Sequence, residues 1–233
     1  MSKEDVSSDE MARRFRKCAS ASIFDVLDGM YDMPNQCLDL GIKPLVETMR
    51  VAGPAFTVRG AREPRSMYDL QRDPKFEDWG LFRAMHPGCV VVIDAQSEGP
   101  CGHFGEMMSY VSRQFGATGV VIDGGIRDRA GLLAIPDWPV FARYTSPVES
   151  NRRWMIDDMQ VPINLSGTLT ASVRLNPGDW IVGDADGVMV IPQEIAYEVL
   201  LKAEDVERRE EATRRDLAAG VPVWDVFAKY GRM

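Results

Sequence analysis

The stretch that most constrains the fold runs from residue 105 to residue 128 and reads GEMMSYVSRQFGATGVVIDGGIRD. Its first half predicts a helix that ends at Gly116, because four apolar residues recur at helical spacing: Met107, Met108, Val111 and Phe115. The apolar, β-branched run at 119–123 then predicts a buried strand, broken by the two glycines that follow it. Arg127 and Asp128 should therefore lie just past the carboxyl end of a strand, where α/β sheets place ligand sites.

This helix and strand carry an acid at each end, Glu106 and Asp128, and an arginine, Arg127, beside the second acid. Carboxylates are hard oxygen ligands that suit Mg²⁺ or Mn²⁺, and arginine offers a planar, charged donor fork for an oxyanion. The backbone N–H groups at the helix start, from Glu106 to Met108, can receive another anionic group. Together they indicate a site for a small oxyacid whose enolate needs stabilising. The sequence leaves open a simpler alternative, in which Arg127 and Asp128 only cap a helix and pair with neighbours.

Length and composition place the chain among soluble globular proteins. Its 233 residues, 45% hydrophobic and 27% charged, fit one domain with a short appendage. A net charge of −8 with no basic stripe argues against a nucleic-acid partner. No apolar run suits a membrane span, and the N-terminus lacks the apolar core of a signal peptide. We therefore expect a cytoplasmic protein with four reduced cysteines, and the two histidines argue against a His/Cys zinc site.

The rest of the chain predicts a mixed order of helices and strands. Helices are expected over 8–18 with Ser8 as N-cap, from residue 20 or 22 to 29, near 81–85, over 194–217 and over 221–230. Residues 51–59 are expected to form a turn and then a strand. Further strands are expected over 89–94, 139–143, 161–165, 171–175, 180–183 and 188–191. Residues 60–80, which are polar with two prolines, are predicted to form a surface loop with a turn of helix.

The C-terminal third suggests a division into an α/β domain, residues 1–193, and a helical tail, residues 194–233. The tail has an apolar face, expected to pack on its own domain or on a neighbouring subunit, that includes Val199, Leu200 and Val206. Glu204 could reach the metal waters of a neighbouring subunit, but a solvated helix face is the simpler expectation. Before the tail, Asp184 and Asp186 could contribute to the site of a neighbouring subunit, but they are expected to serve the turn of a hairpin.

In its motifs and their order the chain resembles the RraA-like proteins. Five segments match in the family's order: AGPAFTV at 52–58, PGCVVVID at 87–94, FGEMMS at 104–109, GVVIDGGIRDRAG at 119–131 and NPGDWIVGDADGVMVIP at 176–192. The family includes the 4-hydroxy-4-methyl-2-oxoglutarate and 4-carboxy-4-hydroxy-2-oxoadipate aldolases of bacterial aromatic-acid breakdown. The resemblance, which covers about residues 20–200, implies a layered α/β fold, a swivelling β/β/α sandwich. It also implies homotrimers or homohexamers with sites between subunits.

The resemblance implies a role for each residue of the central stretch. Asp128 would hold Mg²⁺ (or Mn²⁺) directly, Glu106 would hold the metal's water, and Arg127 would contact the keto or enolate oxygen. The backbone from Gly105 through Met107 and Met108 would bind the substrate carboxylate. The implied reaction is metal-dependent, class II cleavage of a 4-hydroxy-2-oxo di- or tricarboxylic acid to release pyruvate. Oxaloacetate decarboxylation passes through the same enolate and is expected as a side activity.

Three observations bear on this assignment. No lysine lies between Lys75 and Lys202, which disfavours a Schiff-base aldolase. Glu106 stands where the family's characterised aldolases carry aspartate, and glutamate also occurs there in a branch that binds and inhibits a ribonuclease. Residues 60–80 match no member closely and could select the substrate. A non-catalytic regulatory binding protein, or a related lyase acting on a different oxyacid, therefore remains an alternative.

Several neighbouring residues have a structural and a chemical interpretation. Cys101 and His103 could suggest a thiol nucleophile, but without a third partner in the sequence they indicate loop packing. Asp123, at the end of the buried strand, is expected to make a structural pairing and could orient Arg127. Met107 and Met108 are expected in the core or in the lining of a pocket rather than in the chemistry.

Overall fold

The computed structural model describes residues 6–73, 80–95 and 99–231. Within these residues, the main sheet has nine strands. Seven of them follow the order β1 (Lys43–Pro44), β6 (Val140–Thr145), β5 (Gly119–Ile126), β3 (Val90–Asp94), β2 (Val51–Arg62), β10 (Trp180–Gly183) and β11 (Val188–Ile191). Strands β2, β3, β5 and β6 are parallel neighbours, whereas β1, β10 and β11 pair antiparallel. Two further strands, β4 (Gly102–Phe104) and β7 (Trp154–Met159), pair with β5 and β2.

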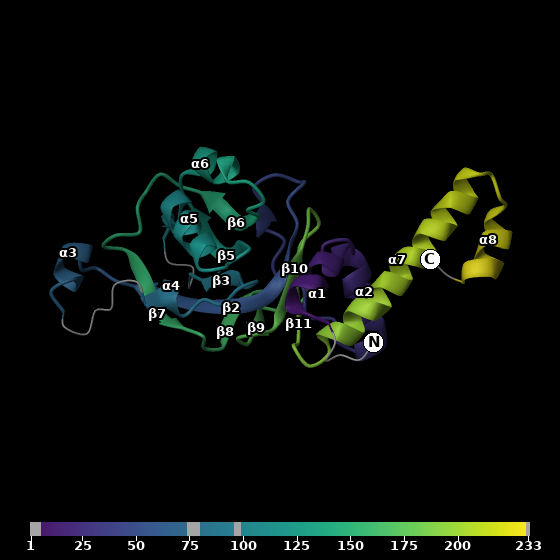
Figure 1. Ribbon diagram of the computed structural model, residues 1–233, viewed down its shortest axis with the longest axis horizontal. Helices are drawn as coiled ribbons and strands as arrows, with labels where there is room; N and C mark the ends of the chain where they lie inside the picture. The colour runs from purple at the N-terminus through teal and green to yellow at the C-terminus, as the bar shows by residue number, and fades with distance from the viewer. Residues whose placement is uncertain (1–5, 74–79, 96–98, 232–233) are drawn as a thin grey trace.

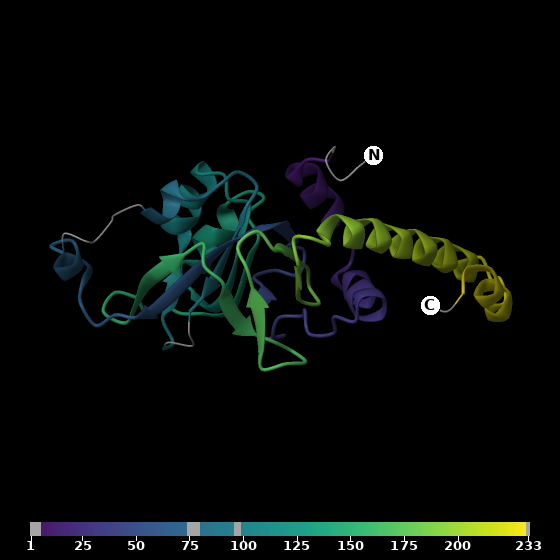
Figure 2. The same ribbon diagram turned by 90° about the horizontal axis from the view of Figure 1, so that it is seen from below.

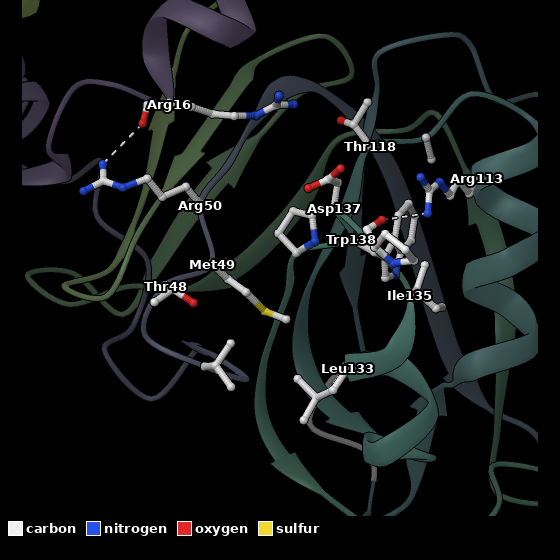
Figure 3. A pocket seen from close by; sticks show the side chains of 14 residues that line it. Arg16, Thr48, Met49, Arg50, Arg113, Thr118, Leu133, Ile135, Asp137 and Trp138 are labelled. Atoms are coloured by element: carbon white, nitrogen blue, oxygen red, sulfur yellow. Dashed lines mark hydrogen bonds between the residues drawn. The ribbon is translucent and has the colours of Figure 1, made fainter.

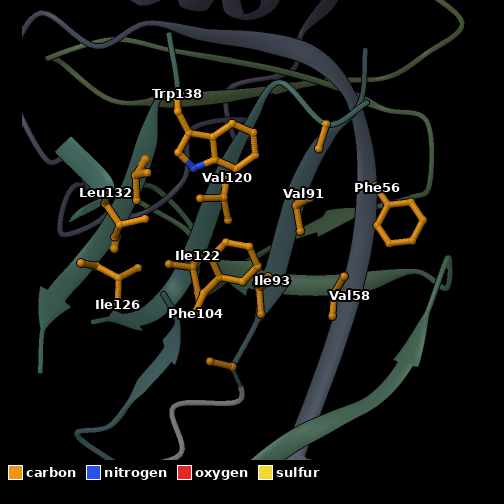
Figure 4. Close-up of a cluster of buried hydrophobic side chains, with 14 of the residues drawn as sticks. Phe56, Val58, Val91, Ile93, Phe104, Val120, Ile122, Ile126, Leu132 and Trp138 are labelled. Atoms are coloured by element: carbon orange, nitrogen blue, oxygen red, sulfur yellow. The ribbon is translucent and has the colours of Figure 1, made fainter. Parts of the chain in front are cut away.

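Successive side chains along the central strands point to opposite faces of the sheet. Both faces are apolar, and each is covered by a different layer. On one face, residues such as Phe56, Val91 and Ile122 cluster with Leu132 of α6 (Arg129–Ala134), as Figure 4 shows. Two partly buried residues of α5 (Glu106–Gln114), Met108 and Val111, pack against the same cluster. On the other, Val90, Val92 and Val121 pack against a separate two-stranded sheet, β8 (Ile163–Ser166) with β9 (Ser172–Leu175). Figure 1 shows the resulting layers of helix, sheet and sheet. The layered α/β fold is therefore confirmed, as is the antiparallel pairing of the strands near 163 and 172.

A third core joins the two ends of the chain. Helices α1 (Ser8–Phe15), α2 (Ser20–Tyr31) and α7 (Ala196–Ala218) pack over β10 and β11, with the rings of Phe15 and Trp180 5.3 Å apart. Val199 and Leu200 are fully buried here, so the apolar face of the tail packs on its own domain. Beyond this contact α7 projects from the body, and α8 (Val223–Tyr230) folds back along it (Figures 1 and 2).

Polar contacts from α7 and from the turn between β10 and β11 hold helices α1 and α2 in place. The N-cap residue of α2 is Ala19, which has no side chain that could accept a hydrogen bond. Glu207 accepts a hydrogen bond from the Ala19 amide at 2.7 Å, and Asp184 accepts one from the Ser20 amide at 2.9 Å. The expectation for Glu204 was wrong, because its carboxylate forms a 2.6 Å ion pair with Arg14 of α1 instead of facing solvent. This hydrogen bond raises the pKa of Arg14.

Strand β2 differs from its prediction at both ends. It is continuous from Val51 with no initial turn, because Pro54 lies opposite Trp180 and the next amide, of Ala55, still donates to Asp179 O at 2.8 Å. It also extends to Arg62, because it pairs with β7, a strand that the sequence analysis does not predict. The segment 60–80 therefore begins as a strand, followed by the short helix α3 (Met67–Leu70). Residues 74–79 of that segment lie outside the described residues, and α4 (Gly80–Arg83) follows them.

Strand β5 does not break at its two glycines. β3 ends beside Asp123, but β4 then takes its place, so that Gly125 has Gly102 of β4 on one side and Tyr144 of β6 on the other. Gly125 therefore has a neighbouring strand on each side, and β5 continues to Ile126.

Two helix details also differ from the sequence analysis. The inner face of α5 is formed by Ser109 and Ser112, with Met108 and Val111 partly buried, whereas Met107 and Phe115 are exposed. The N-cap of α1 is Ser7, whose hydroxyl accepts from the Glu10 amide at 3.2 Å. None of the helices in the described ranges combines the length and apolarity needed to cross a membrane.

Candidate active site

Two neighbouring strand ends bring the central residues together. β4 and the last residues of β5 are parallel, and the Arg127 amide donates to Phe104 O at 2.9 Å. Because both strands leave the sheet at the same edge, the chain continues into α5 at Glu106 beside the point where Arg127 and Asp128 lead into α6. The structure thus places the acid, the arginine and the second acid at one edge of the sheet.

Asp128 occupies the N-cap position of α6 but does not cap it. Its backbone is left-handed, with φ at 60°, and its side chain makes no capping hydrogen bond, in contrast to Ser7 in α1. The carboxylate instead lies 3.3 Å from Arg127 Nε, and the Asp128 side chain is 42% exposed. The simpler alternative is therefore right about the position of Asp128 and about its pairing with a neighbour, and wrong about capping. The carboxylate remains partly exposed and accessible to a ligand.

Gly105 allows the start of α5 to approach this pair. A methyl group at Gly105 would lie 2.8 Å from both Asp128 Oδ2 and Arg127 Cγ. As the N-cap, Gly105 also provides no side-chain oxygen for the helix, and the first intrahelical bond runs from the Ser109 amide to Gly105 O. The N–H groups of the first turn have no acceptor within the helix and give this end of α5 a partial positive charge.

Glu106 lies on the α6 side of this junction. Its side chain is half-buried, and a methyl group at Gly131 of α6 would collide with its carboxylate. Asp128 thus lies against Gly105 at the start of α5, and Glu106 lies against Gly131 of α6. Met107, in contrast, is 64% exposed at the cleft.

A cleft of about 310 Å³ opens over the pair. The residues that line it come from β4, the first turn of α5, the end of β5 and the segment after β6: Gly102, His103, Phe104, Gly105, Met107, Met108, Arg127, Asp128, Glu149 and Ser150. The expectation that Met107 and Met108 line a pocket therefore agrees with the structure.

The sequence analysis missed Glu149 and Ser150. Glu149 Oε1 lies 3.8 Å from Arg127 Nη1, whereas Asp128 Oδ2 lies 3.3 Å from Arg127 Nε. Both residues follow the carboxyl end of β6, and the rule that drew attention to Arg127 would also have indicated this segment.

Asp123 does not orient Arg127, so that part of its interpretation was wrong. Along β5 it follows Ile122, which faces the helices, and therefore points to the opposite face. There it pairs with Arg143 and accepts a hydrogen bond from the Ser166 amide of β8 at 2.7 Å. Burial lowers the pKa of Arg143, but hydrogen bonds to Asp123 and Asp39 leave it above its usual range. Asp123 thus makes the expected structural pairing, but between the two sheets.

Cys101 and His103 are buried at the back of the cleft. His103 Nδ1 lies 3.1 Å from the Gly125 amide nitrogen and 3.3 Å from Gly125 O, and Nε2 lies 3.5 Å from Cys101 Sγ. The ring also lies edge-on against Trp154, with centroids 4.9 Å apart. These contacts agree with a packing role for both residues.

The oxygen donors at this edge fit a hard divalent cation. Within the described part of the chain, no three His, Cys, Asp or Glu side chains are grouped to share an ion. Mg²⁺ and Mn²⁺ do not need such a group, because Mg²⁺ in particular keeps several waters and binds through one or two carboxylates. Asp128, which is exposed and does not cap α6, could supply one direct oxygen. Glu106 does not line the cleft in the described residues, because its carboxylate lies against Gly131 of α6.

A larger cavity, of about 830 Å³, lies at the opposite edge of the sheet (Figure 3). Its lining includes Arg50, Thr118 and Pro139, which directly precede β2, β5 and β6. Two of its arginines already donate to backbone oxygens, Arg50 to Cys18 O at 3.2 Å and Arg113 to Pro136 O at 2.7 Å. Ligand sites in parallel sheets form at the carboxyl ends of strands, so the smaller cleft is the better candidate.

The comparisons with known proteins agree with this architecture. Residues 20–190 match the family described as RraA-like: Aldolase/RraA. The chain belongs to the RraA-like family. It is 33% identical over 211 residues to a Halalkalibacterium halodurans protein provisionally named a 4-hydroxy-4-methyl-2-oxoglutarate aldolase, and the match covers 89% of each chain.

Solved structures of this RraA-like fold extend the comparison. The crystal structure of Streptomyces coelicolor RraAS2, called an unusual member of the RNase ES inhibitor RraA protein family, superposes with a TM-score of 0.73 at 27% identity. That match covers 88% of this chain and 97% of RraAS2. An uncharacterised protein from Pseudomonas syringae pv. tomato superposes with a TM-score of 0.76 at 25% identity, over 94% and 96% of the two chains. The family resemblance and its layered fold are therefore confirmed.

Proposed function

We propose that this protein is a divalent-metal-dependent lyase that cleaves a 4-hydroxy-2-oxo acid and releases pyruvate, with oxaloacetate decarboxylation as a side activity. The observation that carries the proposal is the arrangement of three groups in one cleft: the Arg127 guanidinium, the Asp128 carboxylate, which makes no capping hydrogen bond to α6, and the start of α5. The provisional aldolase name of the Halalkalibacterium halodurans relative supports the same reaction class.

Each group would have a distinct role. The first-turn amides of α5 would bind the C1 carboxylate of the substrate, since that helix end lacks a side-chain cap. The Arg127 fork would donate hydrogen bonds to the C2 oxygen. As the C3–C4 bond breaks, negative charge gathers on that oxygen, and the hydrogen bonds from Arg127 strengthen.

Asp128 and Glu106 would hold Mg²⁺ or Mn²⁺ at the mouth of the cleft, Asp128 directly and Glu106 through water. When bound, the ion supplies Lewis-acid polarisation of the C2 carbonyl. The chain supplies the fixed geometry: the close approach at Gly105 holds Asp128 and Arg127 against the start of α5.

The test is pyruvate release, measured with oxaloacetate and with 4-hydroxy-4-methyl-2-oxoglutarate, in the presence of Mg²⁺ and after EDTA treatment. We expect release from at least one substrate, loss with EDTA and recovery when Mg²⁺ is restored. Turnover that persists in EDTA would refute metal dependence. No release from either of these dicarboxylic acids or from the monocarboxylic 4-hydroxy-2-oxopentanoate, by a folded protein with Mg²⁺, would refute the lyase assignment.

A second candidate is a regulatory binding protein, favoured by the likeness to RraAS2, whose description places it in a family of RNase ES inhibitors. A folded protein that releases no pyruvate but lowers the activity of an added endoribonuclease of that class would establish this alternative.

We also propose that the protein forms a homotrimer or homohexamer. The projecting α7–α8 arm supports this, because it carries large apolar side chains that its own domain leaves exposed: Leu217, Val221, Val223 and Trp224, the last 77% exposed. Light scattering should give three or six times the chain mass of 26.0 kDa. A monomer at micromolar concentration would contradict the proposal.

A further inference from the structure

Glu149 is fixed at the cleft by its backbone. The Gly102 amide donates to Val148 O at 2.8 Å, and Gly102 and Glu149 form an isolated parallel bridge. The neighbouring Ser146 hydroxyl donates to Pro100 O at 2.6 Å and accepts from the Val148 amide at 3.2 Å. The segment after β6 is therefore anchored beside β4, and it holds a carboxylate near the predicted reaction centre.

The residue that follows extends the same anchorage. The Arg153 amide and the Trp154 amide both donate to Ser150 O, at 2.8 and 2.9 Å, and Arg153 Nη1 donates to Glu149 O at 3.2 Å. These bonds join the Glu149 segment to the start of β7. The Glu149 side chain itself is 63% exposed, so its charge faces the opening of the cleft while its backbone is held.

The carboxylates around Arg127 divide the cleft into two ends. Asp128 lies near Nε and beside Gly105 at the start of α5, whereas Glu149 lies near Nη1. A 2-oxo acid with its C1 carboxylate at α5 and its C2 oxygen at Arg127 would therefore extend its remaining carbons toward Glu149 and Ser150. At that end it would meet a negative charge and a serine side chain.

We propose that Glu149 determines specificity by disfavouring substrates with a carboxylate on the distal half, so that the preferred class is 2-oxo monocarboxylic acids with a hydroxylated distal half. This inference rests on the proposed function for its turnover consequences, and it makes a separate claim about binding. Two like charges a few ångströms apart near a protein surface repel by an amount that changes affinity about tenfold. Ionic strength should screen the effect.

The binding test compares two 2-oxo acids that differ at the distal end, pyruvate and 2-oxoglutarate, by isothermal titration calorimetry in the presence of Mg²⁺. In Glu149→Gln, we expect 2-oxoglutarate to bind about tenfold more tightly relative to pyruvate than in the wild type, with a smaller change at 0.5 M salt. The matched control is Glu47→Gln, which makes the same charge change at an exposed residue of the loop before β2, at the opposite edge of the sheet.

A turnover test complements the binding test. The ratio of kcat/KM for 4-hydroxy-4-methyl-2-oxoglutarate to that for 4-hydroxy-2-oxopentanoate should rise about tenfold in Glu149→Gln and stay constant in Glu47→Gln. An unchanged binding ratio in Glu149→Gln, an equal change in Glu47→Gln, or no binding of either 2-oxo acid would overturn the inference. Binding that shifts as expected in a protein that releases no pyruvate would support the role of Glu149 and refute the lyase assignment.

Discussion

Replacing Asp184 with alanine removes the carboxylate that holds the first turn of α2 from across the fold. That carboxylate accepts three hydrogen bonds: from the Ser20 amide at 2.9 Å, from the Ser20 hydroxyl at 2.6 Å and from the Asp186 amide at 3.0 Å. Because α2 begins after an alanine, no local side chain can replace this cap. Asp184 therefore stabilises α2 in addition to the hairpin turn that the sequence predicts.

The expected cost follows from the groups left behind. Loss of a helix cap costs about 1 kcal/mol. A buried hydroxyl deprived of its partner costs about 1–3 kcal/mol more, and Ser20 is buried. We expect Asp184→Ala to lower the free energy of unfolding by about 2–4 kcal/mol, which for a chain of this length corresponds to a Tm lower by roughly 5–15 °C.

The assay is urea unfolding followed by circular dichroism, at one fixed protein concentration because assembly would shift the midpoint. Asp186→Ala is the matched control, since Asp186 is an exposed acid in the same hairpin. If Asp184→Ala unfolds within about 0.5 kcal/mol of Asp186→Ala, the carboxylate does not hold α2.

The pH dependence provides an independent check. Burial raises the pKa of Asp184, but the hydrogen bonds from Ser20 and Asp186 and the nearby Arg50 leave it below its ordinary value. A carboxyl whose folded pKa is depressed contributes stability above its unfolded pKa, about 3.9, and loses it as the pH falls through the folded value. The stability difference between wild type and Asp184→Ala should therefore be full at neutral pH and shrink below about pH 4.

Three further predictions concern the cleft and the thiols. Arg127→Ala should lower kcat for pyruvate release about 10²–10³-fold with a smaller change in KM, and Arg127→Lys should recover only part of the loss because lysine lacks the planar fork; steady-state kinetics with circular dichroism as control would refute the role if folded variants kept full activity. Asp128→Ala should abolish activity under limiting Mg²⁺, whereas Glu106→Ala should lower turnover about 10–100-fold; wild-type activity of Asp128→Ala at low Mg²⁺ would remove Asp128 from the site. Burial, together with Glu207 and Glu204, raises the pKa of Cys18 to about 11. Iodoacetamide at pH 8 should therefore modify the half-exposed Cys37 well before Cys18, which peptide mass spectrometry can measure; equal labelling rates in the native protein would contradict this.

The sequence predicted most strands of the main sheet because they are apolar on both faces. β3 and β5 are buried along their whole length, and such runs stand out without any knowledge of their neighbours. β7 is different: its sequence, WMIDDM, places two acids in the strand, and only its first residue is buried. It forms because β2 extends far enough to pair with it, and a pairing between distant segments leaves no local signal.

The same distinction explains which contacts of individual acids were predicted. The turn role of Asp184 follows from its neighbours in the hairpin, but its bond to Ser20 joins residues 164 positions apart. Glu204 and Arg14 are 190 positions apart, so a charged helix face looked solvated when it was in fact paired. Asp123 was assigned a partner close in sequence, although the alternation of β5 directs it to the second sheet and to Arg143.

Glu106 and Arg127 could be associated from the sequence because one helix and one strand connect them. The nine residues of α5 rise about 14 Å away from the cleft. The eight residues of β5 return about 26 Å, so the strand is longer than the helix and its end lies beyond the start of a helix that followed β3 directly. β4 resolves the mismatch, because its pairing with Gly125 and Ile126 carries the chain out to the end of β5 before α5 starts. The twenty residues between Glu106 and Arg127 are thus the length of one return path, which a sequence can reveal. The sequence could have indicated the segment after β6 by the same strand-end rule, but not which of its residues reaches Arg127. Glu149 reaches the cleft through a bridge to Gly102, and a contact between such distant residues leaves no local signal.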